Sequence, residues 1–360
     1  MRFGEQLSDE RLIELLRPGR GIDTVITADT YGQGDADRLL ARALDGLPRD
    51  GYSLVGAIGH DFYEGERRGP KGFPRFTDPE LRGPDGYRDY LRMATEGVLE
   101  RLGVSRLDLL LLHNPDRIGY TSEVVWGELR RLRDEGLTAA IGVAPGPANG
   151  FTLDLIHCFE LFGSEIGWGM VILNPFEPWP GELVLDAAAG NGIKLITRVA
   201  DYGGLFWGDV RPGHELAEHD HRGFRPDGWI EAGAAKLAQL DPILEQTGLT
   251  LMQLACAWNL SHPAVECVAP TLIQEIGAGS RTIEDKRDEL AALPAGAALT
   301  PEQVDAIRAI GDNRGSMVLK GASTEHEGAD QADRWSLTPE LSELAERWGI
   351  DPATDLVKTA

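Results

Sequence analysis

The sequence has little cysteine, a shortage of positive charge and no long apolar segment. Only three of its 360 residues are cysteines, Cys158, Cys256 and Cys267, and no two of them form a CxxC pair. This pattern gives no sign of a disulfide framework, so we expect reduced thiols that pack in the core and a cytoplasmic location.

The charges also restrict the partners that the protein can have. Lysine and arginine number 35 against 58 aspartates and glutamates, which gives a net charge of -23. An acidic surface repels phosphate backbones, so we expect no nucleic acid partner. No apolar run is long enough to span a bilayer, and residues 1–20 lack the apolar core of a signal peptide. We therefore expect a small-molecule substrate and no membrane partner, whereas the sequence leaves the oligomeric state open.

What is present is a regular alternation of apolar strand-like segments and amphipathic helix-like segments. Continuous apolar strands that alternate with helices are typical of a parallel sheet covered on its faces. The expected strands are residues 21–29, 52–59, 106–113, 138–144, 167–174, 193–200 and 264–270, with a short one at residues 1–3. Eight strands favour a (β/α)8 TIM barrel with a shortened first strand. We expect the barrel to comprise residues 1–311, with 301–311 as the last regular helix, and residues 312–360 to form a C-terminal extension that packs on it.

The chemistry of such barrels lies where the strands end and the loops begin. Four polar side chains occupy these positions: Tyr31, His113, Asn174 and Arg198. A histidine after four leucines, in "LLLLHNPD", is expected to face a substrate, although a histidine at a strand end is more often a hydrogen-bonded core group. Arg198 needs an anionic or polar partner at a buried mouth, either a protein carboxylate such as Asp201 or Glu177 or a substrate group. Asn174 either caps the sheet or binds substrate.

One histidine-rich stretch suggests a metal site only superficially. In "HELAEHDHRGF" (214–224), His219 and His221 flank Asp220. Ligands at positions i and i+2 require an extended loop, and no second cluster supplies further ligands. We therefore expect a solvated loop and no metal.

Several of these segments resemble the aldo/keto reductase family. "ITADTYGQGDADRLLARAL" is similar to its strand, Tyr-Gly and helix segment, and "RLGVSRLDLLLLHNPD" to the strand that ends in its catalytic histidine. "LRDEGLTAAIGVAP" is similar to its turn and following strand, "VADYGGLFWG" to the glycine-containing loop around the cofactor pyrophosphate, and "GSRTIEDKRDELAAL" to the segment that grips the adenosine phosphate of NADP(H). The match covers residues 20–310 approximately, and its order and spacing are specific.

The resemblance implies a catalytic tetrad of Asp, Tyr, Lys and His, of which this sequence keeps half. In the family, the tyrosine protonates the carbonyl oxygen, the lysine lowers its pKa and the histidine orients the substrate. The tyrosine matches Tyr31 and the histidine matches His113, whereas the aspartate position holds Ile26 and the lysine position holds Ala57. A tyrosine needs a nearby cation to act at neutral pH, and Arg198 is one candidate for that cation. The alternative is that Tyr31 only packs at the strand end.

The resemblance also implies NADP(H) as a possible cofactor, and no metal. The residues that follow the pattern of the phosphate end are Gly203, Gly204, Leu205, Ser280 and Arg281. The nicotinamide end departs from the pattern, because the family's Ser-Asn pair aligns with Ala144 and Pro145.

Three functions remain open. The first is an NADP(H)-linked oxidoreductase of a small carbonyl or sugar-like hydroxycarbonyl compound, as the family implies. The second is a redox-silent isomerase or lyase in which Tyr31, His113 and Arg198 enolise such a compound or eliminate from it. The third is a non-catalytic barrel. The fold cannot choose between them, because function belongs to the site.

Overall fold

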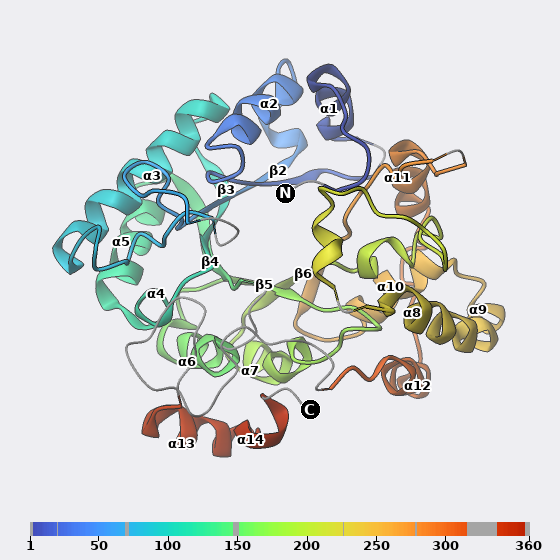
Figure 1. The fold of residues 1–360 in the computed structure, drawn as a ribbon. Coiled ribbons are helices and arrows are strands. Elements are labelled where there is room, and N and C mark those ends of the chain that lie inside the picture. The colour runs from blue at the N-terminus through green and yellow to red at the C-terminus, as the bar shows by residue number, and fades with distance from the viewer. Residues whose placement is uncertain are drawn as a thin grey trace.

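The structure is a computed structural model that describes residues 3–19, 21–68, 72–146, 151–225, 227–277, 279–314 and 337–356. Its centre is a curled sheet in which seven strands pair in sequence order, every neighbouring pair being parallel. The strands are β1 (Thr24–Ala28), β2 (Ser53–Ile58), β3 (Leu107–His113), β4 (Thr138–Ala144), β5 (Trp168–Ile172), β6 (Lys194–Arg198) and β7 (Val265–Ala269). Viewed along its axis, the sheet surrounds a central space, with helices around its outside (Figure 1).

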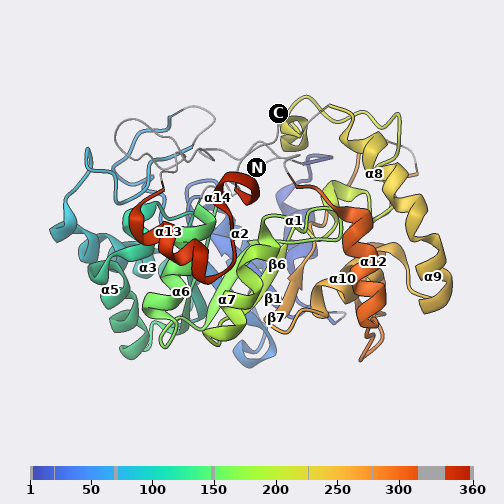
Figure 2. The same cartoon turned by 90° about the horizontal axis from the view of Figure 1, so that it is seen from below.

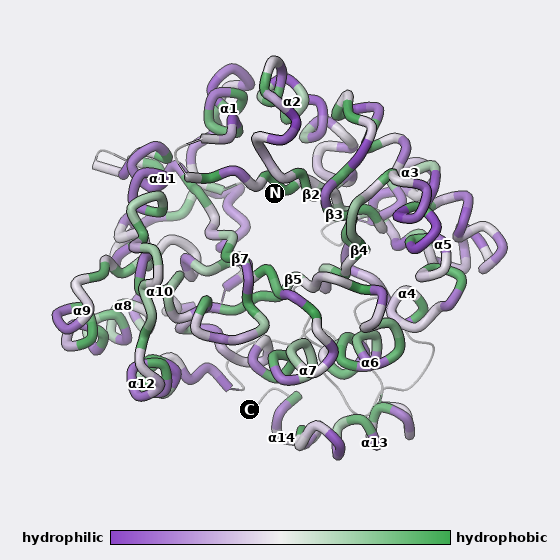
Figure 3. The backbone as a smooth tube through the Cα atoms, turned by 180° about the vertical axis from the view of Figure 1, so that it is seen from behind, coloured by the Kyte–Doolittle hydropathy of each residue, from purple (hydrophilic) through white to green (hydrophobic). Residues whose placement is uncertain are grey.

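The helices cover the outer face of this sheet and turn their apolar sides towards it. They are α1 (Asp9–Leu16), α2 (Asp35–Leu44), α3 (Tyr87–Leu102), α4 (Arg117–Thr121), α5 (Glu123–Asp134), α6 (Thr152–Phe162), α7 (Leu185–Gly190), α8 (Trp229–Leu237), α9 (Asp241–Thr247), α10 (Leu251–Leu260), α11 (Ile283–Ala291), α12 (Pro301–Gly311), α13 (Pro339–Arg347) and α14 (Pro352–Asp355). Seen from the opposite end, the helices around the strands carry both hydrophilic and hydrophobic stretches (Figure 3).

Alternation along the strands produces two separate hydrophobic clusters. In β3, Leu110 and Leu112 belong to the large cluster shared with the helices, whereas Leu109 and Leu111 belong to a small one inside the barrel. Successive side chains of a strand point to opposite faces, which is why one apolar run serves both clusters. The small cluster consists of Ala28, Val55, Ala57, Leu109, Leu111, Ala144, Met170 and Ile196.

Local sequence signals explain where the covering helices begin. Thr250 and Gln253 form a capping box at the start of α10, and Thr300 and Gln303 form another at the start of α12. Each box satisfies backbone N–H groups that have no partner within the helix. These caps fix the helices that follow the long segment after β6 and the segment after β7.

The expected barrel architecture is confirmed. The segment between β6 and α10, for which the sequence gives no clear strand or helix pattern, contains α8 and α9. The helix at 301–311 is not the last, because α13 and α14 follow it. The strand expected at residues 1–3 falls mainly on residues outside the described ranges, so β1 and β7 are the two ends of the strand order among the described residues.

The described part of the expected extension, residues 337–356, lies against the outside of the barrel. Helix α13 buries Leu341, Leu344 and Ala345 and contacts α6. Figures 1 and 2 both place α13 and α14 outside α6 and α7. The Nε1–H of Trp179, in the loop after β5, donates to the carbonyl of Asp355 over 2.5 Å. The division at residue 311 remains a prediction. None of the described helices is long and apolar enough to cross a membrane.

Candidate active site

The carboxyl ends of the strands bring Tyr31, His113 and Arg198 to one mouth of the barrel. His113 is the last residue of β3 and pairs with Ala144, and Arg198 is the last residue of β6 and pairs with Ala269. Tyr31 lies three residues after the end of β1, in a turn where its N–H donates to the carbonyl of Ala28. Parallel strands end at the same edge of a sheet, so these side chains converge as expected.

Three rings stand in a row at this mouth. The rings of Tyr31 and His113 are 6.0 Å apart between centroids and nearly perpendicular, and the rings of His113 and His60 are 5.3 Å apart. Nδ1 of His60 lies 2.9 Å from the carbonyl oxygen of Phe73, and its Nε2 lies 2.9 Å from the side-chain amide nitrogen of Asn114. A carbonyl can only accept and an amide nitrogen can only donate, so His60 carries its proton on Nδ1. The imidazole of His60 is thus fixed by two hydrogen bonds, and it packs edge-on against the ring of His113.

Burial keeps both histidines neutral. It lowers the pKa of His60 to about 4, with the charge of Arg75 acting in the same direction. It also lowers the pKa of His113 well below its ordinary value, and His60, Arg198 and Arg75 add to the effect. Nδ1 of His113 is buried without a hydrogen bond within the described residues. A neutral imidazole can both donate and accept a hydrogen bond, as binding a carbonyl or hydroxyl group requires.

Tyr31 and Arg198 influence each other electrostatically. The surrounding protein partly desolvates the hydroxyl of Tyr31 and so raises its pKa, although 39% of the residue is exposed, and the charge of Arg198 acts against this rise. Burial also lowers the pKa of Arg198, which Tyr31 and Glu177 oppose. A cation near a phenol stabilises the phenolate, so Arg198 acts on Tyr31 in the direction that acid–base chemistry needs.

Arg198 forms no ion pair with a carboxylate of the described residues. Its Nη2 donates to the carbonyl of Pro145 over 3.1 Å. Of the two carboxylates expected to pair with it, Glu177 receives both Nη groups of Arg225 at 2.9 and 3.1 Å. The other, Asp201, accepts the N–H groups of Gly204 and Thr271. Since a buried guanidinium requires anionic or polar partners, Arg198 is free to bind a ligand group.

Asn174 is placed differently from the other three. Its side chain is fully buried, and its carbonyl oxygen accepts the N–H groups of Phe176 and Glu177. Its amide group donates to Glu177 and to the carbonyl of Val199. Three of these hydrogen bonds lie within the loop after β5, and the one to Val199 joins that loop to the end of β6. A role in binding substrate remains a prediction, and the amide is already committed to the protein.

The positions of the aspartate and the lysine in the expected tetrad carry apolar side chains, Ile26 and Ala57. Ala57 pairs with Ala28 in the neighbouring strand and lies in the small cluster inside the barrel, 5% exposed. Ile26 lies two residues before the end of β1 and is 38% exposed. Neither side chain can carry a charge or donate a proton.

The glycine loop after β6 is tightly folded. Gly203 and Gly204 belong to a 3-10 turn, Tyr202–Gly204, and have φ angles of 65° and 99°. Asp201 caps this turn by accepting the N–H of Gly204 over 2.9 Å. Leu205 follows and is fully buried. A Cβ atom on Gly204 would lie 2.8 Å from Val210, so the position has room only for glycine.

Ser280 and Arg281 lie on the segment before α11. The hydroxyl of Ser280 donates to the carbonyl of Gly277. Arg281 donates to the carbonyl of Trp207 at 3.1 Å and to the carboxylate of Glu289 at 2.6 Å. Arg281 therefore connects this segment to the glycine loop, and its charge is already balanced by a carboxylate.

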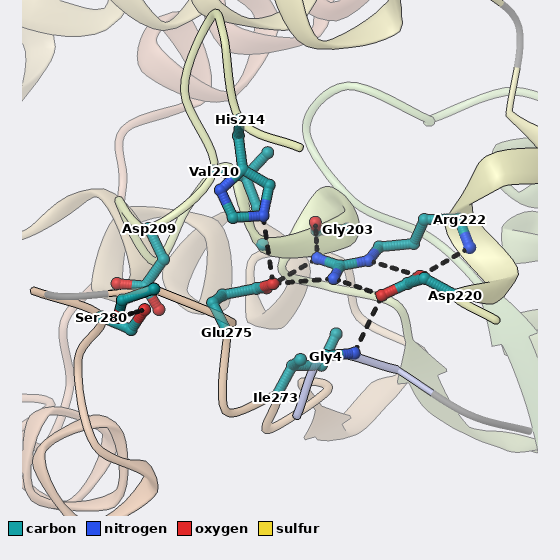
Figure 4. A network of polar contacts seen from close by, with 12 residues as sticks. Gly4, Gly203, Asp209, Val210, His214, Asp220, Arg222, Ile273, Glu275 and Ser280 are labelled. Atoms are coloured by element: carbon teal, nitrogen blue, oxygen red, sulfur yellow. Dashed lines mark hydrogen bonds and ion pairs between the residues drawn. The ribbon is translucent and has the colours of Figure 1, made fainter. Parts of the chain in front are cut away.

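Next to the glycine loop lies a dense cluster of charges around Arg222 (Figure 4). We call Arg222, Asp220 and Glu275 the Arg222 cluster; their exposed fractions are 4%, 5% and 2%. The expectation of a solvated loop at residues 214–224 is therefore wrong at Asp220 and Arg222. The reason is that the arginine's charge is met by two carboxylates, one from the same turn and one from the segment after β7. Within the described residues, no three histidines, cysteines or acidic residues are grouped closely enough to hold a metal.

A sequence profile of the Aldo/keto reductase family matches residues 1–312. The chain belongs to this family. The D-threo-aldose 1-dehydrogenase of a Pseudomonas species is 30% identical over 148 residues, which are 38% of this chain and 44% of that enzyme, so the match spans less than half of the relative.

Among solved structures, the glycerol dehydrogenase of Gluconobacter oxydans has a TM-score of 0.65 and 21% identity, covering 86% of this chain and 87% of that one. An aldo/keto reductase from Klebsiella pneumoniae, solved with NADP and acetate, has a TM-score of 0.56 and 18% identity, covering 85% and 87%. At these identities the solved structures support the aldo/keto reductase fold alone.

The structure adds His60 and Glu275 to the residues that the sequence points to. His60 lies two residues after Ile58, the last residue of β2, so its place just beyond a strand end is a usable signal. Glu275 lies between β7 and α11, where the sequence contains no pattern that predicts its contact with Arg222. Long-range ion pairs of this kind depend on loop paths that the sequence does not specify.

Proposed function

We propose that the protein is an oxidoreductase that acts on a small carbonyl or sugar-like hydroxycarbonyl compound, with NADP(H) as its cofactor. The observation that carries the proposal is the partly buried Arg198, which lacks a carboxylate partner among the described residues and faces the mouth shared with Tyr31 and His113. A substrate carbonyl, hydroxyl, carboxylate or phosphate supplies the missing partner.

In this proposal each side chain has one task. The hydroxyl of Tyr31 donates a proton to the carbonyl oxygen during reduction and accepts it back during oxidation. The neutral imidazole of His113 orients the substrate through a hydrogen bond. The guanidinium of Arg198 stabilises the phenolate that forms on Tyr31, and its planar fork binds an oxygen of the substrate. NADP(H), when bound, would supply or accept the hydride.

We also propose that the family's catalytic tetrad is incomplete in this chain. Ile26 and Ala57 stand at the aspartate and lysine positions, so Arg198 takes over the electrostatic task of the lysine. This substitution is supported by the opposing effects of burial and of Arg198 on the pKa of Tyr31. Asn174 acts by holding the loop beside Arg198 in place.

The phosphate end of the expected cofactor site contains cations, whereas its nicotinamide end has no side chain that could bind a carboxamide. The cations around the glycine loop and the segment before α11 are Arg222, Arg281 and Lys286, and each is paired with a carboxylate of the chain in this form. Ala144 and Pro145 offer no side-chain hydrogen bond at the other end. We therefore assign cofactor binding mainly to Gly203, Gly204, Leu205, Ser280 and Arg281. The three cysteines are free thiols, which supports a cytoplasmic location.

A redox-silent isomerase or lyase is the second candidate, and the apolar residues at the tetrad's aspartate and lysine positions favour it. Both functions use the same three side chains, so the experiment must separate hydride transfer from proton transfer. We would incubate the protein with small aldoses, ketoses and hydroxyaldehydes, following NADPH absorbance in one series. A second series in D2O without cofactor would follow exchange of the proton next to the carbonyl by NMR.

Oxidoreduction predicts substrate-dependent turnover of NADPH or NADP⁺ that Tyr31→Phe lowers at least about 100-fold, the usual size of a general acid contribution. Tyr120→Phe is the matched control, because it removes the hydroxyl of a fully buried tyrosine outside the mouth. Proton exchange that depends on Tyr31, without nicotinamide turnover, would instead establish the redox-silent function. Absence of both reactions over the whole panel would refute both proposals.

A further inference from the structure

The guanidinium of Arg222 is saturated by its own chain. It donates to Asp220 from Nε and Nη2 at 2.9 and 2.7 Å, and to Glu275 from Nη1 and Nη2 at 2.6 and 2.8 Å. A fifth hydrogen bond runs from Nη1 to the carbonyl of Gly203 at 2.9 Å. A guanidinium has five N–H donors, so none remains for a ligand.

The two carboxylates that hold Arg222 are not equivalent. Asp220 belongs to the same turn and also accepts the backbone N–H groups of Arg222 and Gly4, each over 2.9 Å. Glu275 comes from the segment after β7, and besides Arg222 it has His214 within ion-pair distance, at 3.4 Å. Asp220 therefore shapes the turn, whereas Glu275 is attached to the cluster through its carboxylate.

Glu275 lies directly against the glycine loop. A Cβ atom built on Gly204 would lie 3.1 Å from Oε1 of Glu275 and 3.2 Å from Nη1 of Arg222. Figure 4 shows the carboxylate of Glu275 aimed at Arg222 beside the carbonyl of Gly203. Carboxylates and phosphates make the same two-pronged contact with a guanidinium, so a phosphoryl group that binds these two N–H groups of Arg222 has to displace Glu275.

The neighbouring cations show the same internal neutralisation. Arg281 is paired with Glu289 at 2.6 Å, and the fully buried Lys286 is paired with Asp209. When the Arg222 cluster is included, this region contains three cations and four carboxylates. The carboxylates are Asp209, Asp220, Glu275 and Glu289. The region in this form presents a net negative charge, which opposes the approach of a phosphate-bearing ligand.

We propose that Glu275 is an internal competitor for a phosphoryl group and holds the glycine loop closed until a nucleotide phosphate displaces it from Arg222. The inference rests on the proposed use of NADP(H), and it adds a residue that weakens and gates that binding. Release of Glu275 frees two N–H groups of Arg222 and leaves Asp220 in place as the structural partner. The affinity for a phosphate-bearing ligand is then set by the exchange of one anion for another.

The test is Glu275→Gln, which keeps the shape of the side chain and removes its charge. We expect the dissociation constant for NADPH, measured by nucleotide fluorescence, to fall at least about tenfold, which corresponds to about 1.4 kcal/mol. Glu266→Gln is the matched control, because Glu266 is an exposed carboxylate of β7 that pairs with Lys194 at 3.9 Å, outside the cluster. Its dissociation constant should equal that of the wild type. Asp220→Asn should lower the melting temperature without tightening binding.

Inorganic pyrophosphate provides a second probe that is independent of the cofactor. Millimolar pyrophosphate should raise the melting temperature of Glu275→Gln more than that of the wild type or of Glu266→Gln. If Glu275→Gln does not fold, the shorter Glu275→Asp, which loses part of the two-pronged contact, takes its place in both measurements.

The outcomes separate the two proposals. Tightening with both probes supports the competitor role together with NADP(H) use. Tightening with pyrophosphate, but no NADPH binding to any variant, supports the competitor role and removes the proposed cofactor. Tight NADPH binding that is equal in wild type and Glu275→Gln keeps the cofactor and overturns the competitor role, as does the absence of any gain with either probe.

Discussion

Replacing Arg198 by methionine separates a ligand-binding arginine from a structural one. Methionine has a similar length and no charge, and the only hydrogen bond of the side chain to the described residues that it removes is the one to the carbonyl of Pro145. Because burial lowers the pKa of Arg198, its charge is held at some cost in the free protein. We therefore expect the free energy of unfolding to stay the same or to rise slightly.

The effect on function should be large. A hydrogen bond to a charged group contributes about 1.5–3 kcal/mol, so losing one contact between Arg198 and a substrate oxygen weakens binding about 10- to 150-fold. Loss of the cation also raises the pKa of Tyr31 further, because Arg198 is the charge that opposes the rise caused by burial. Turnover should therefore fall at saturating substrate as well as at low substrate concentration.

Arg225→Met is the matched control for this prediction. Arg225 forms a two-pronged ion pair with Glu177, whose side chain is 7% exposed. Removing one partner of a buried pair costs about 3–5 kcal/mol, which for a chain of this length lowers the melting temperature by about 4–7 °C. Melting curves and steady-state kinetics of both variants constitute the assay. An Arg198→Met variant that melts early and keeps its turnover would refute the assignment of Arg198 to the substrate.

Three further predictions concern pH and packing. The pKa of His60 is about 4 in the folded protein and 6.5 in the unfolded chain, so the unfolded state takes up a proton first as the pH falls. The free energy of unfolding should therefore drop by about 3 kcal/mol between pH 6.5 and 4. In urea titrations, His60→Gln should make the free energy of unfolding depend less on pH over this range. Gly213→Ala should destabilise the fold by about 1 kcal/mol, because its φ is positive but its new Cβ would contact nothing within 4 Å. Gly204→Ala should destabilise the fold by more than this, because its Cβ would also lie too close to Val210. Equal melting temperatures of the two variants would contradict the close approach to Val210. Leu344→Ala in α13 should lower the free energy of unfolding by about 2–5 kcal/mol, because the residue is 1% exposed. Leu161→Ala should lower it much less, because Leu161 is half-exposed. An unchanged stability of Leu344→Ala would show that α13 is not packed on the barrel.

The sequence predicts the strands well because each contains a short apolar run. The expected ranges 138–144 and 301–311 coincide with β4 and α12. The sequence does not predict helices α8 and α9. They are short, and the segment around them is rich in glycine, proline and charged residues, so a helical spacing of apolar residues is hard to detect there. Helix α13 was missed for a different reason: its apolar residues have meaning only against the outer face of α6, a contact that no local pattern reveals.

The candidate site divides in the same way. Strand ends predict that His113 and Arg198 share one mouth, since backbone pairing alone places them there. The lack of a carboxylate partner for Arg198 could not be predicted. It arises because Glu177 pairs with Arg225, from a loop almost thirty residues away, and because Asp201 accepts backbone N–H groups instead. The burial of Arg222 was hidden for a similar reason, since the carboxylate of Glu275 arrives from a segment 53 residues further along.

The contacts of residues 3–5 have a consequence for the order in which the chain folds. The N–H of Gly4 reaches the carboxylate of Asp220, 216 residues away, and the N–H of Glu5 reaches the carbonyl of Gln274. Contacts of such long sequence separation form late, after the entropy of closing a large loop has been offset by nearer contacts. They can also open without the strands separating, as a local unfolding event. Amide protons of Gly4 and Glu5 should therefore exchange with solvent long before those of β3, even though both groups are hydrogen-bonded in the folded protein.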